Sequence, residues 1–277
     1  MFGELFYIEG DTIQSVGTDN SRLLILLNEH HLSTVLYDPL KKLVFEWGML
    51  ELPVDMQNRE EAVKGYFNNH HLVSKSKEGA ALVSLTGRQS IIPLSLSDPK
   101  QIYLFAQLQF PCGKEDLLLT DKDLGSNTAV IYSPEQPVYT GLKRLFPTLS
   151  SSHLFHHILK QPATGEPILT IDILPSRCII TFQHQKKWQL LQSYHYQSGE
   201  DILFLLLKTM DQLGTQPVDT IVSINGLVDR NSSLAKLIEQ YIPVLQWGSE
   251  LHFSYPASEG FDSHTFSLID SILTCVS

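Results

Sequence analysis

The chain of 277 residues contains two segments that read alike, and this internal repeat constrains its fold more than any other feature. Leu23 to Val44 (LLILLNEHHLSTVLYDPLKKLV) aligns without a gap on Ile168 to Gln189 (ILTIDILPSRCIITFQHQKKWQ). Each segment predicts three strands joined by two turns, because a β-rich apolar run is followed by an alternating one. Two later segments, Leu82 to Gly87 (LVSLTG) and Ile221 to Gly226 (IVSING), match in the same order. We therefore expect a duplicated domain.

A helix is predicted between the matched segments of each half, over Asn58 to Asn69 and over Ser198 to Leu213. Asn58 and Ser198 are plausible N-caps, and acidic residues follow each of them. A helix that returns the chain to a new strand implies right-handed parallel pairing, so each half should be a mixed sheet with helices packed on it.

The predicted boundary lies at the linker Gln161–Pro167, which gives halves over residues 1–160 and 161–277. A further helix and strand should complete each half. In the first half these are a strand over 129–133 and a helix over 136–146, and in the second a helix over 232–241 and a strand over 244–247. The first half also carries an insertion at about residues 88–127, with an extended piece over 90–96, a helix opened by Ser97, Asp98 and Pro99, and a strand over 116–120.

Charge excludes one class of partner. A formal net charge of −10 repels a phosphate backbone, and the basic pairs are scattered, so we expect no nucleic acid partner. Apolar runs are too short for a membrane span, and the acidic N-terminal stretch does not read as a secretory signal. The three cysteines, Cys112, Cys178 and Cys275, are too far apart to indicate a zinc ribbon or a disulfide framework. We expect a cytoplasmic protein.

The repeated order of three meander strands, helix, strand, helix and strand resembles the duplicated ribonuclease-H-like fold of the actin-like ATPase superfamily. Together with YHYQSGEDILFLLLKTMDQLG and IVSING, the chain is similar to an uncharacterised bacterial family of unknown function assigned to that superfamily. The resemblance implies an α/β fold of two ribonuclease-H-like halves with mixed sheets flanked by helices. The pilus-assembly actin-like proteins are the nearest analogy, and only for the fold.

The resemblance also implies three loops that would grip a nucleotide, and all three depart from the superfamily pattern. The first phosphate loop, Leu27 to His31, has no glycine, and Glu29 would face a phosphate with like charge. In the second, Asp172 stands at the end of the first strand, but Pro175 removes a backbone donor. The adenosine loop around Asn225 has one glycine, Gly226, where the pattern has two. These losses predict a fold without its ATPase site.

Other chemistries find little support. A two-metal nuclease needs several converging carboxylates, and only Asp172 with Glu200 or Asp201 offers a start. His153, His156 and His157 have the spacing of one helical face, which is a zinc possibility, but solvent-exposed histidines are the simpler reading. No nucleophile elbow or standard nucleotide loop occurs, and Cys178 reads as a buried strand residue.

We therefore predict a non-catalytic protein that acts through protein–protein interaction, with no cofactor and no metal. The partner is an unidentified protein or a second copy, docking on the insertion, on a sheet edge, or on the C-terminal aromatic residues Trp247, Phe253, Tyr255, Phe261 and Phe266. The alternative is a divergent nucleotide-binding phosphohydrolase that uses the cleft between the halves, in which Asp172, Asn225 and Gly226 would bind the nucleotide.

Overall fold

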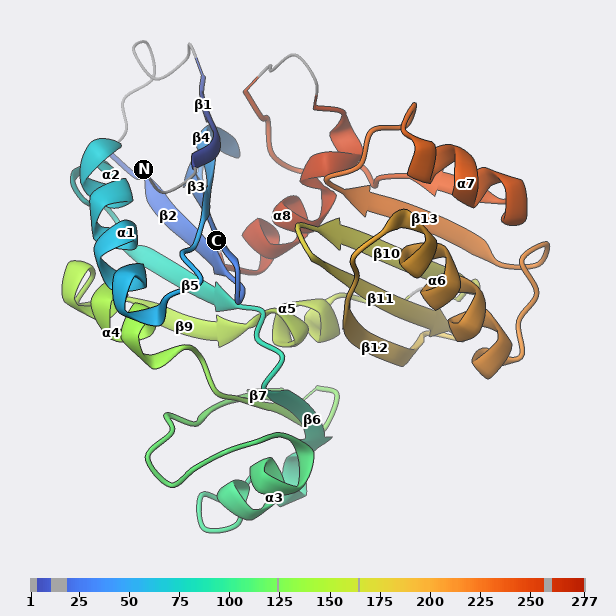
Figure 1. The fold of residues 1–277 in the computed structure, drawn as a ribbon, viewed down its shortest axis with the longest axis horizontal. Helices are drawn as coiled ribbons and strands as arrows, with labels where there is room; N and C mark the ends of the chain where they lie inside the picture. Colours follow the sequence, from blue (N-terminus) through green and yellow to red (C-terminus); the bar gives the residue numbers. More distant parts are fainter. Residues whose placement is uncertain (1–3, 11–18, 124, 164, 257–260, 277) are drawn as a thin grey trace. The chain divides into compact units, whose positions relative to one another are not determined.

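The computed structural model describes residues 4–10, 19–123, 125–163, 165–256 and 261–276, and it divides into two compact units (Figure 1). Unit 1 comprises Met1–Lys160, Phe253–Ala257 and Leu273–Ser277, and unit 2 comprises Gln161–His252 and Ser258–Ile272. Two short C-terminal segments thus belong with unit 1, although the sequence places all of 161–277 in the second half. None of the described helices has the length and apolar character needed to cross a bilayer.

Unit 1 is built on a six-stranded mixed sheet with the order β1-β4-β3-β2-β5-β9. The strands are β1 (Glu4–Glu9), β2 (Arg22–Leu27), β3 (His31–Asp38), β4 (Leu43–Glu51), β5 (Ala80–Ser84) and β9 (Ser150–His153). The meander pairs are antiparallel, whereas β2 with β5 and β5 with β9 are parallel. β2 reads RLLILL and is buried for most of its length, as expected for a central strand covered on both faces.

Helices α1 (Met56–Asn69) and α4 (Gln136–Leu145) pack beside each other against the sheet of unit 1 (Figure 1). Their apolar side chains, among them Tyr66, Phe67 and Leu142, form one buried cluster with residues of β2 and β5. Helix α1 begins earlier than predicted, because Asp55 rather than Asn58 caps it through the Gln57 backbone N–H. The short helices α2 (Leu72–Lys75) and α5 (Leu154–Lys160) complete the main body.

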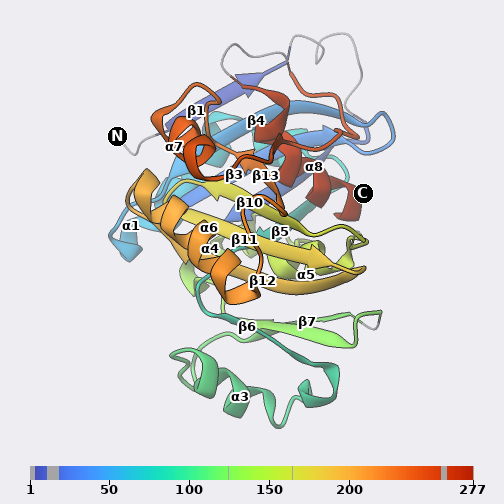
Figure 2. The same cartoon turned by 90° about the vertical axis from the view of Figure 1, so that its right-hand side faces the viewer.

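The insertion forms a three-stranded antiparallel sheet of its own, with the order β6-β8-β7. It contains β6 (Gln89–Pro93), a 3-10 turn η2 (Leu94–Leu96), α3 (Ile102–Gln109), β7 (Leu119–Asp123) and β8 (Thr128–Tyr132). Figure 2 shows this sheet with α3 on one side of it. The prediction that 129–133 completes the main sheet is wrong: β8 belongs to the insertion, and β9 takes that place. Both segments are short and follow a loop, so pattern alone did not separate them.

Unit 2 is built on a five-stranded sheet with the order β12-β11-β10-β13-β14. The strands are β10 (Ile168–Leu174), β11 (Arg177–His184), β12 (Lys187–His195), β13 (Ile221–Gly226) and β14 (Leu245–Trp247). The helices are α6 (Gly199–Leu213), α7 (Ser233–Tyr241) and α8 (Ser263–Val276), of which α8 belongs to this unit only as far as Ile272. Strand order and pairing direction match those of β4-β3-β2-β5-β9 in unit 1. Ser198 caps α6 with a complete capping box, as the sequence predicts.

Strand register corrects one part of the sequence alignment. Leu23 pairs with Ala80 in unit 1, and the corresponding Ile168 pairs with Ile221 in unit 2. Ile221 is therefore equivalent to Ala80, not to Leu82, and Asn225 is equivalent to Ser84. A displacement of two residues keeps every side chain on its own face of the sheet, so the apolar pattern could not detect it.

Gly48 on β4 makes room for two tyrosine rings. A Cβ there would lie 2.2 Å from the Tyr66 hydroxyl oxygen and 2.5 Å from Tyr7 Cδ2. The Tyr66 hydroxyl is 3.0 Å from Thr34 Oγ1, and Tyr7 donates to the buried carboxylate of Glu46, so neither ring is free to move away. The glycine is therefore a packing requirement of the sheet.

We expect Gly48→Ala to lower the free energy of unfolding by about 1–3 kcal/mol, because the added methyl group overpacks a buried site. The matched control is Gly65→Ala at an exposed position of α1, where an added Cβ meets nothing within 4 Å. That change should raise stability by about 1 kcal/mol through helix propensity. Urea denaturation measures both, and equal effects of the two substitutions would contradict the packing argument.

Candidate functional site

The turn between β2 and β3, where the superfamily pattern places a phosphate loop, is closed by its own side chains. Asn28 Oδ1 accepts the backbone N–H groups of His30 and His31 at 2.8 and 2.7 Å. Asparagine commonly bonds to the backbone two or three residues on, in place of an external acceptor. The amides that a phosphate would need at this turn are therefore already satisfied.

Glu29 closes the neighbouring loop in the same way. Its Oε1 accepts the backbone N–H of Gly87, and Thr86 Oγ1 accepts that of Arg88 at 3.1 Å. This loop follows β5, whose carboxyl end lies beside that of β2. A carboxylate thus already bonds to a backbone N–H of this loop, and its charge would repel an anion there, as the sequence indicates.

The matching turn of unit 2 is a tight connection between β10 and β11. Leu174 pairs with Arg177, so Pro175 and Ser176 alone form the turn, with Ser176 at a φ of 59°. Pro175 has no N–H to offer. The buried Arg177 guanidinium bonds within the sheet, because it donates to Ser193 Oγ at 2.8 Å and to His195 Nε2 at 2.6 Å. Neither turn presents a row of open backbone donors.

Asp172 and Asn225, two of the predicted site residues, are brought together at the carboxyl ends of β10 and β13. They are register partners on adjacent parallel strands, and Asn225 Nδ2 donates to Asp172 Oδ1 at 2.9 Å. Ligands of open α/β sheets bind at this edge. Both side chains are buried, and burial raises the pKa of Asp172 to about 6 although the bond from Asn225 lowers it.

Gly226, the third predicted residue, is fixed by the backbone rather than by a ligand. Its φ is +91°, and a Cβ would lie 2.1 Å from the Ile173 carbonyl oxygen. The next residue, Leu227, donates its N–H to that same oxygen at 2.8 Å. Any side chain here would break the contact between β13 and β10. The packing of the strands therefore explains this glycine without a nucleotide.

The other acidic candidates lie apart from this pair. Asp201 accepts the N–H groups of Gln197 and Ser198 at 2.9 and 3.0 Å, and these bonds lower its pKa. Glu200 is exposed in the first turn of α6. Both therefore serve the helix end. Within the described ranges, no group of three or more His, Cys, Asp or Glu residues is placed to hold a metal ion, so the arrangement supplies one carboxylic acid and no metal cage.

The histidine triplet is a correction to the sequence reading. Helix α5 begins only at Leu154, and His153, His156 and His157 are buried rather than solvent-exposed. His157 Nε2 lies 2.6 Å from Ser152 Oγ, and burial, with His156 and Lys160 nearby, lowers the pKa of His157 to about 4. The flanking Leu154, Phe155 and Ile158 were the available signal for burial. Cys178 is buried, as expected.

Asp172 should make stability depend on pH. Because its folded pKa is raised from 3.8 to about 6, its protonated form favours the folded state, and that contribution is lost as pH rises through 6. Asp172→Asn keeps an acceptor for Asn225 and removes the buried charge. We expect the variant to be more stable than the wild type by about 2–3 kcal/mol at pH 8. The gain should vanish at pH 3.5; urea denaturation at both values measures it, and a gain that is independent of pH would contradict the assignment.

Comparison with known proteins agrees with this architecture. A protein of unknown function with an actin-like ATPase fold from Bacteroides thetaiotaomicron VPI-5482 superposes with a TM-score of 0.71 at 16% sequence identity, over 93% of this chain and 97% of that one. A structure of the PilM–PilN type IV pilus biogenesis complex gives a TM-score of 0.53 at 11% identity, over 92% and 98%. The expected actin-like ATPase fold is confirmed.

A search of the curated proteins found no match. The family model described as a protein of unknown function, DUF3822, matches residues 11–245. Since this range is most of the chain, the protein belongs to the DUF3822 family.

Proposed function

We propose that this chain is a non-catalytic actin-like-fold protein that acts by binding another protein. It has kept the two sheets of an ancestral duplicated domain and lost the phosphate grip at their turns. The free cysteines, Cys112, Cys178 and Cys275, suit a reducing compartment, so we place the protein in the cytoplasm.

One observation supports the proposal that the chain has lost the ability to bind a nucleotide phosphate. In unit 1 the backbone donors of both neighbouring loops are occupied by Asn28 and Glu29 of the chain itself. A phosphate would have to displace these acceptors and sit beside the Glu29 carboxylate. Each charge-assisted hydrogen bond that is not formed costs a ligand roughly 1.5–3 kcal/mol, so the loss of several removes useful affinity.

The insertion supports the interaction role. One face of α3 packs on the insertion's sheet through Ile102 and Ala106, whereas Leu104 and Leu108 are 63% and 78% exposed. Exposed leucines at i and i+4 form an apolar stripe of the kind that partners cover. By contrast, Phe253 and Phe266 are buried, and Trp247, Tyr255 and Phe261 are half-buried, so the C-terminal aromatics offer less open apolar surface than α3. The PilM structure similar to this chain is itself a complex.

A divergent phosphohydrolase is the second candidate. The favouring observation is Asp172, a buried acid with a pKa near neutrality at the ligand-binding edge of a sheet. It lacks a second carboxylate beside it, and its hydrogen-bonding neighbour is an amide. We therefore rank this function below the interaction role.

We expect neither ATP nor ADP with magnesium to shift the melting temperature by more than about 1 °C at 5 mM. A ligand present at its Kd adds only about 0.4 kcal/mol to stability, and weaker ligands add less. Differential scanning fluorimetry measures the shift, and phosphate release measures turnover.

A rise of several degrees would show that the chain binds the nucleotide, and a turnover that Asp172→Asn abolishes would establish the phosphohydrolase instead. Asp219→Asn, an exposed acid in the same unit, is the matched control and should leave any turnover unchanged.

Partner binding should depend on α3. We expect Leu108→Glu to remove a protein that co-purifies with the wild-type chain, because a charge in the apolar stripe must be desolvated on docking. The control is Val218→Glu, at a residue 66% exposed in unit 2. Both changes should alter stability by less than about 0.5 kcal/mol. Quantitative affinity purification measures the loss, and equal recovery with both variants would count against α3.

A further inference from the structure

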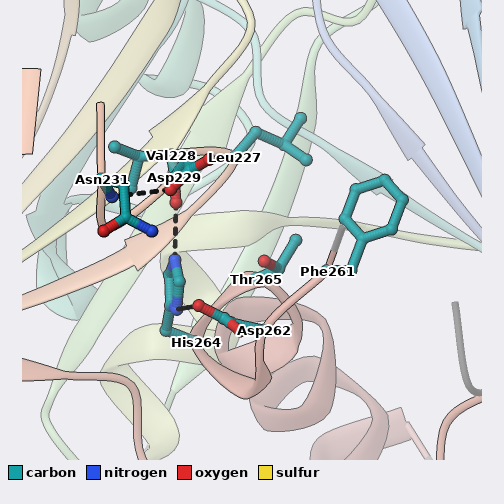
Figure 3. Close-up of a pocket in the computed structure, with 8 residues that line it drawn as sticks. All are labelled: Leu227, Val228, Asp229, Asn231, Phe261, Asp262, His264 and Thr265. Atoms are coloured by element: carbon teal, nitrogen blue, oxygen red, sulfur yellow. Dashed lines mark hydrogen bonds and ion pairs between the residues drawn. The ribbon is translucent and has the colours of Figure 1, made fainter. Parts of the chain in front are cut away.

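A pocket of about 530 Å³ lies in unit 2, next to the loop that follows Gly226 (Figure 3). One wall is the loop after β13 and the other is the start of α8. The lining residues are Leu227, Val228, Asp229, Asn231, Phe261, Asp262, His264 and Thr265. Neither Asp172 nor Asn225 is among them, although Leu227 directly follows Gly226 in the chain.

His264 is the buried polar group of the pocket. Its side chain is 1% exposed, and Nε2 lies 2.7 Å from the Val228 carbonyl oxygen. A carbonyl only accepts, so Nε2 carries a proton, and Nδ1 is an acceptor in the tautomer that has no second proton. Nδ1 is buried and makes no hydrogen bond, and the carboxylate oxygen Asp262 Oδ2 lies 3.9 Å from it. A buried acceptor without a donor is costly unless a ligand supplies one.

The pocket offers mainly acceptors. Asp229 and Asp262 contribute exposed carboxylates, and Thr265 contributes a hydroxyl. Asp229 Oδ1 already accepts the Asn231 backbone N–H at 2.6 Å, but carboxylate oxygens take several bonds each. A fitting ligand must therefore donate several hydrogen bonds, and the Asp229 carboxylate, together with Asp262 that Arg230 already pairs with, favours one that is positively charged.

The surroundings favour a planar cation over a compact one. Arg230 already pairs with Asp262 at 3.3 Å, and its guanidinium carbon lies 5.5 Å from the Trp247 ring centroid. That ring is in edge contact with His264, at 5.0 Å between centroids. Phe261 and Leu227 add apolar surface inside the pocket. A guanidinium can bond to carboxylates in its plane and pack its faces on aromatic rings, which an ammonium cannot do as well.

We propose that this pocket binds a guanidinium group, supplied by an arginine side chain of a partner protein. The arginine would donate to His264 Nδ1 and to the carboxylates of Asp229 and Asp262. The assignment of the arginine to a partner protein depends on the proposed interaction function, whereas the binding of a guanidinium group does not. Failure of the two is therefore distinguishable: ATP binding would end the proposed function and leave this pocket untouched.

The test is an NMR titration of the full chain with N-acetyl-arginine amide, followed through the imidazole nitrogen resonances of His264. We expect a saturable shift at millimolar concentration. The uncharged isostere N-acetyl-citrulline amide should bind at least about fivefold more weakly, because it cannot form the charge-assisted bonds. Free L-arginine is the second arm: a preference for the blocked form assigns a protein partner, and a preference for the free form assigns a small molecule.

Two conservative variants locate the site. Asp229→Asn keeps the acceptor for Asn231, and Asp262→Asn keeps the shape of the rim, so both should fold. Each should weaken binding about fivefold through the loss of one charged acceptor. Asp219→Asn, outside the pocket, should have no effect. The proposal is overturned if the His264 resonances do not shift, if citrulline amide binds equally well, or if adenosine saturates the same resonances and arginine amide does not.

Discussion

Every backbone N–H that leaves water must find an acceptor, and at the turns of unit 1 the acceptors come from the chain itself. Asn28 and Glu29 satisfy the amides of two neighbouring loops, so these loops are ordered without a ligand. In a phosphate-binding loop the same amides are left open, and a bound anion completes them. The chain's own acceptors and a ligand therefore compete for one set of backbone donors. In this chain the donors bond to Asn28 and Glu29.

Unit 2 shows a different compromise at the equivalent edge. Asp172 remains buried although its raised pKa shows that burial disfavours its charge. The equivalent position in unit 1 holds Leu27, which is buried without that cost, and Ser84 stands where unit 2 has Asn225. Each unit keeps one buried polar atom without a hydrogen bond at this position, Ser84 Oγ in unit 1 and Asn225 Oδ1 in unit 2, but only unit 2 also buries a carboxylate. The buried charge of Asp172 therefore costs unit 2 stability that the Leu27 side chain does not cost unit 1.

The sequence predicts those parts of the fold whose residue pattern is compatible with a single structure. The meanders were predictable because three consecutive strands with clear turns leave little choice of pairing. The N-cap role of Ser198 was predictable because a capping box depends only on residues close together in the sequence. The pairing of β5 and β13 was missed by two residues, since a two-residue slip preserves the faces of a strand. Strand β1, which follows no turn signal, was not predicted at all. The His264 pocket was also missed, because it joins a loop and a helix start far apart in sequence.

The pocket and the Asp172–Asn225 pair are linked by Gly226, and this link determines how the pocket can work. Leu227, the first residue of the pocket wall, is bonded through its N–H to Ile173 of β10, and Gly226 permits that contact only at a positive φ. Leu227 cannot move without breaking this bond at the end of the parallel pairing of β10 and β13. A ligand must therefore fit a preformed site, and its affinity has to come from charge and hydrogen bonding at His264, Asp229 and Asp262 instead of from closure. A rigid site of this kind is suited to recognising one side chain of a partner, since little ordering has to be offset on binding.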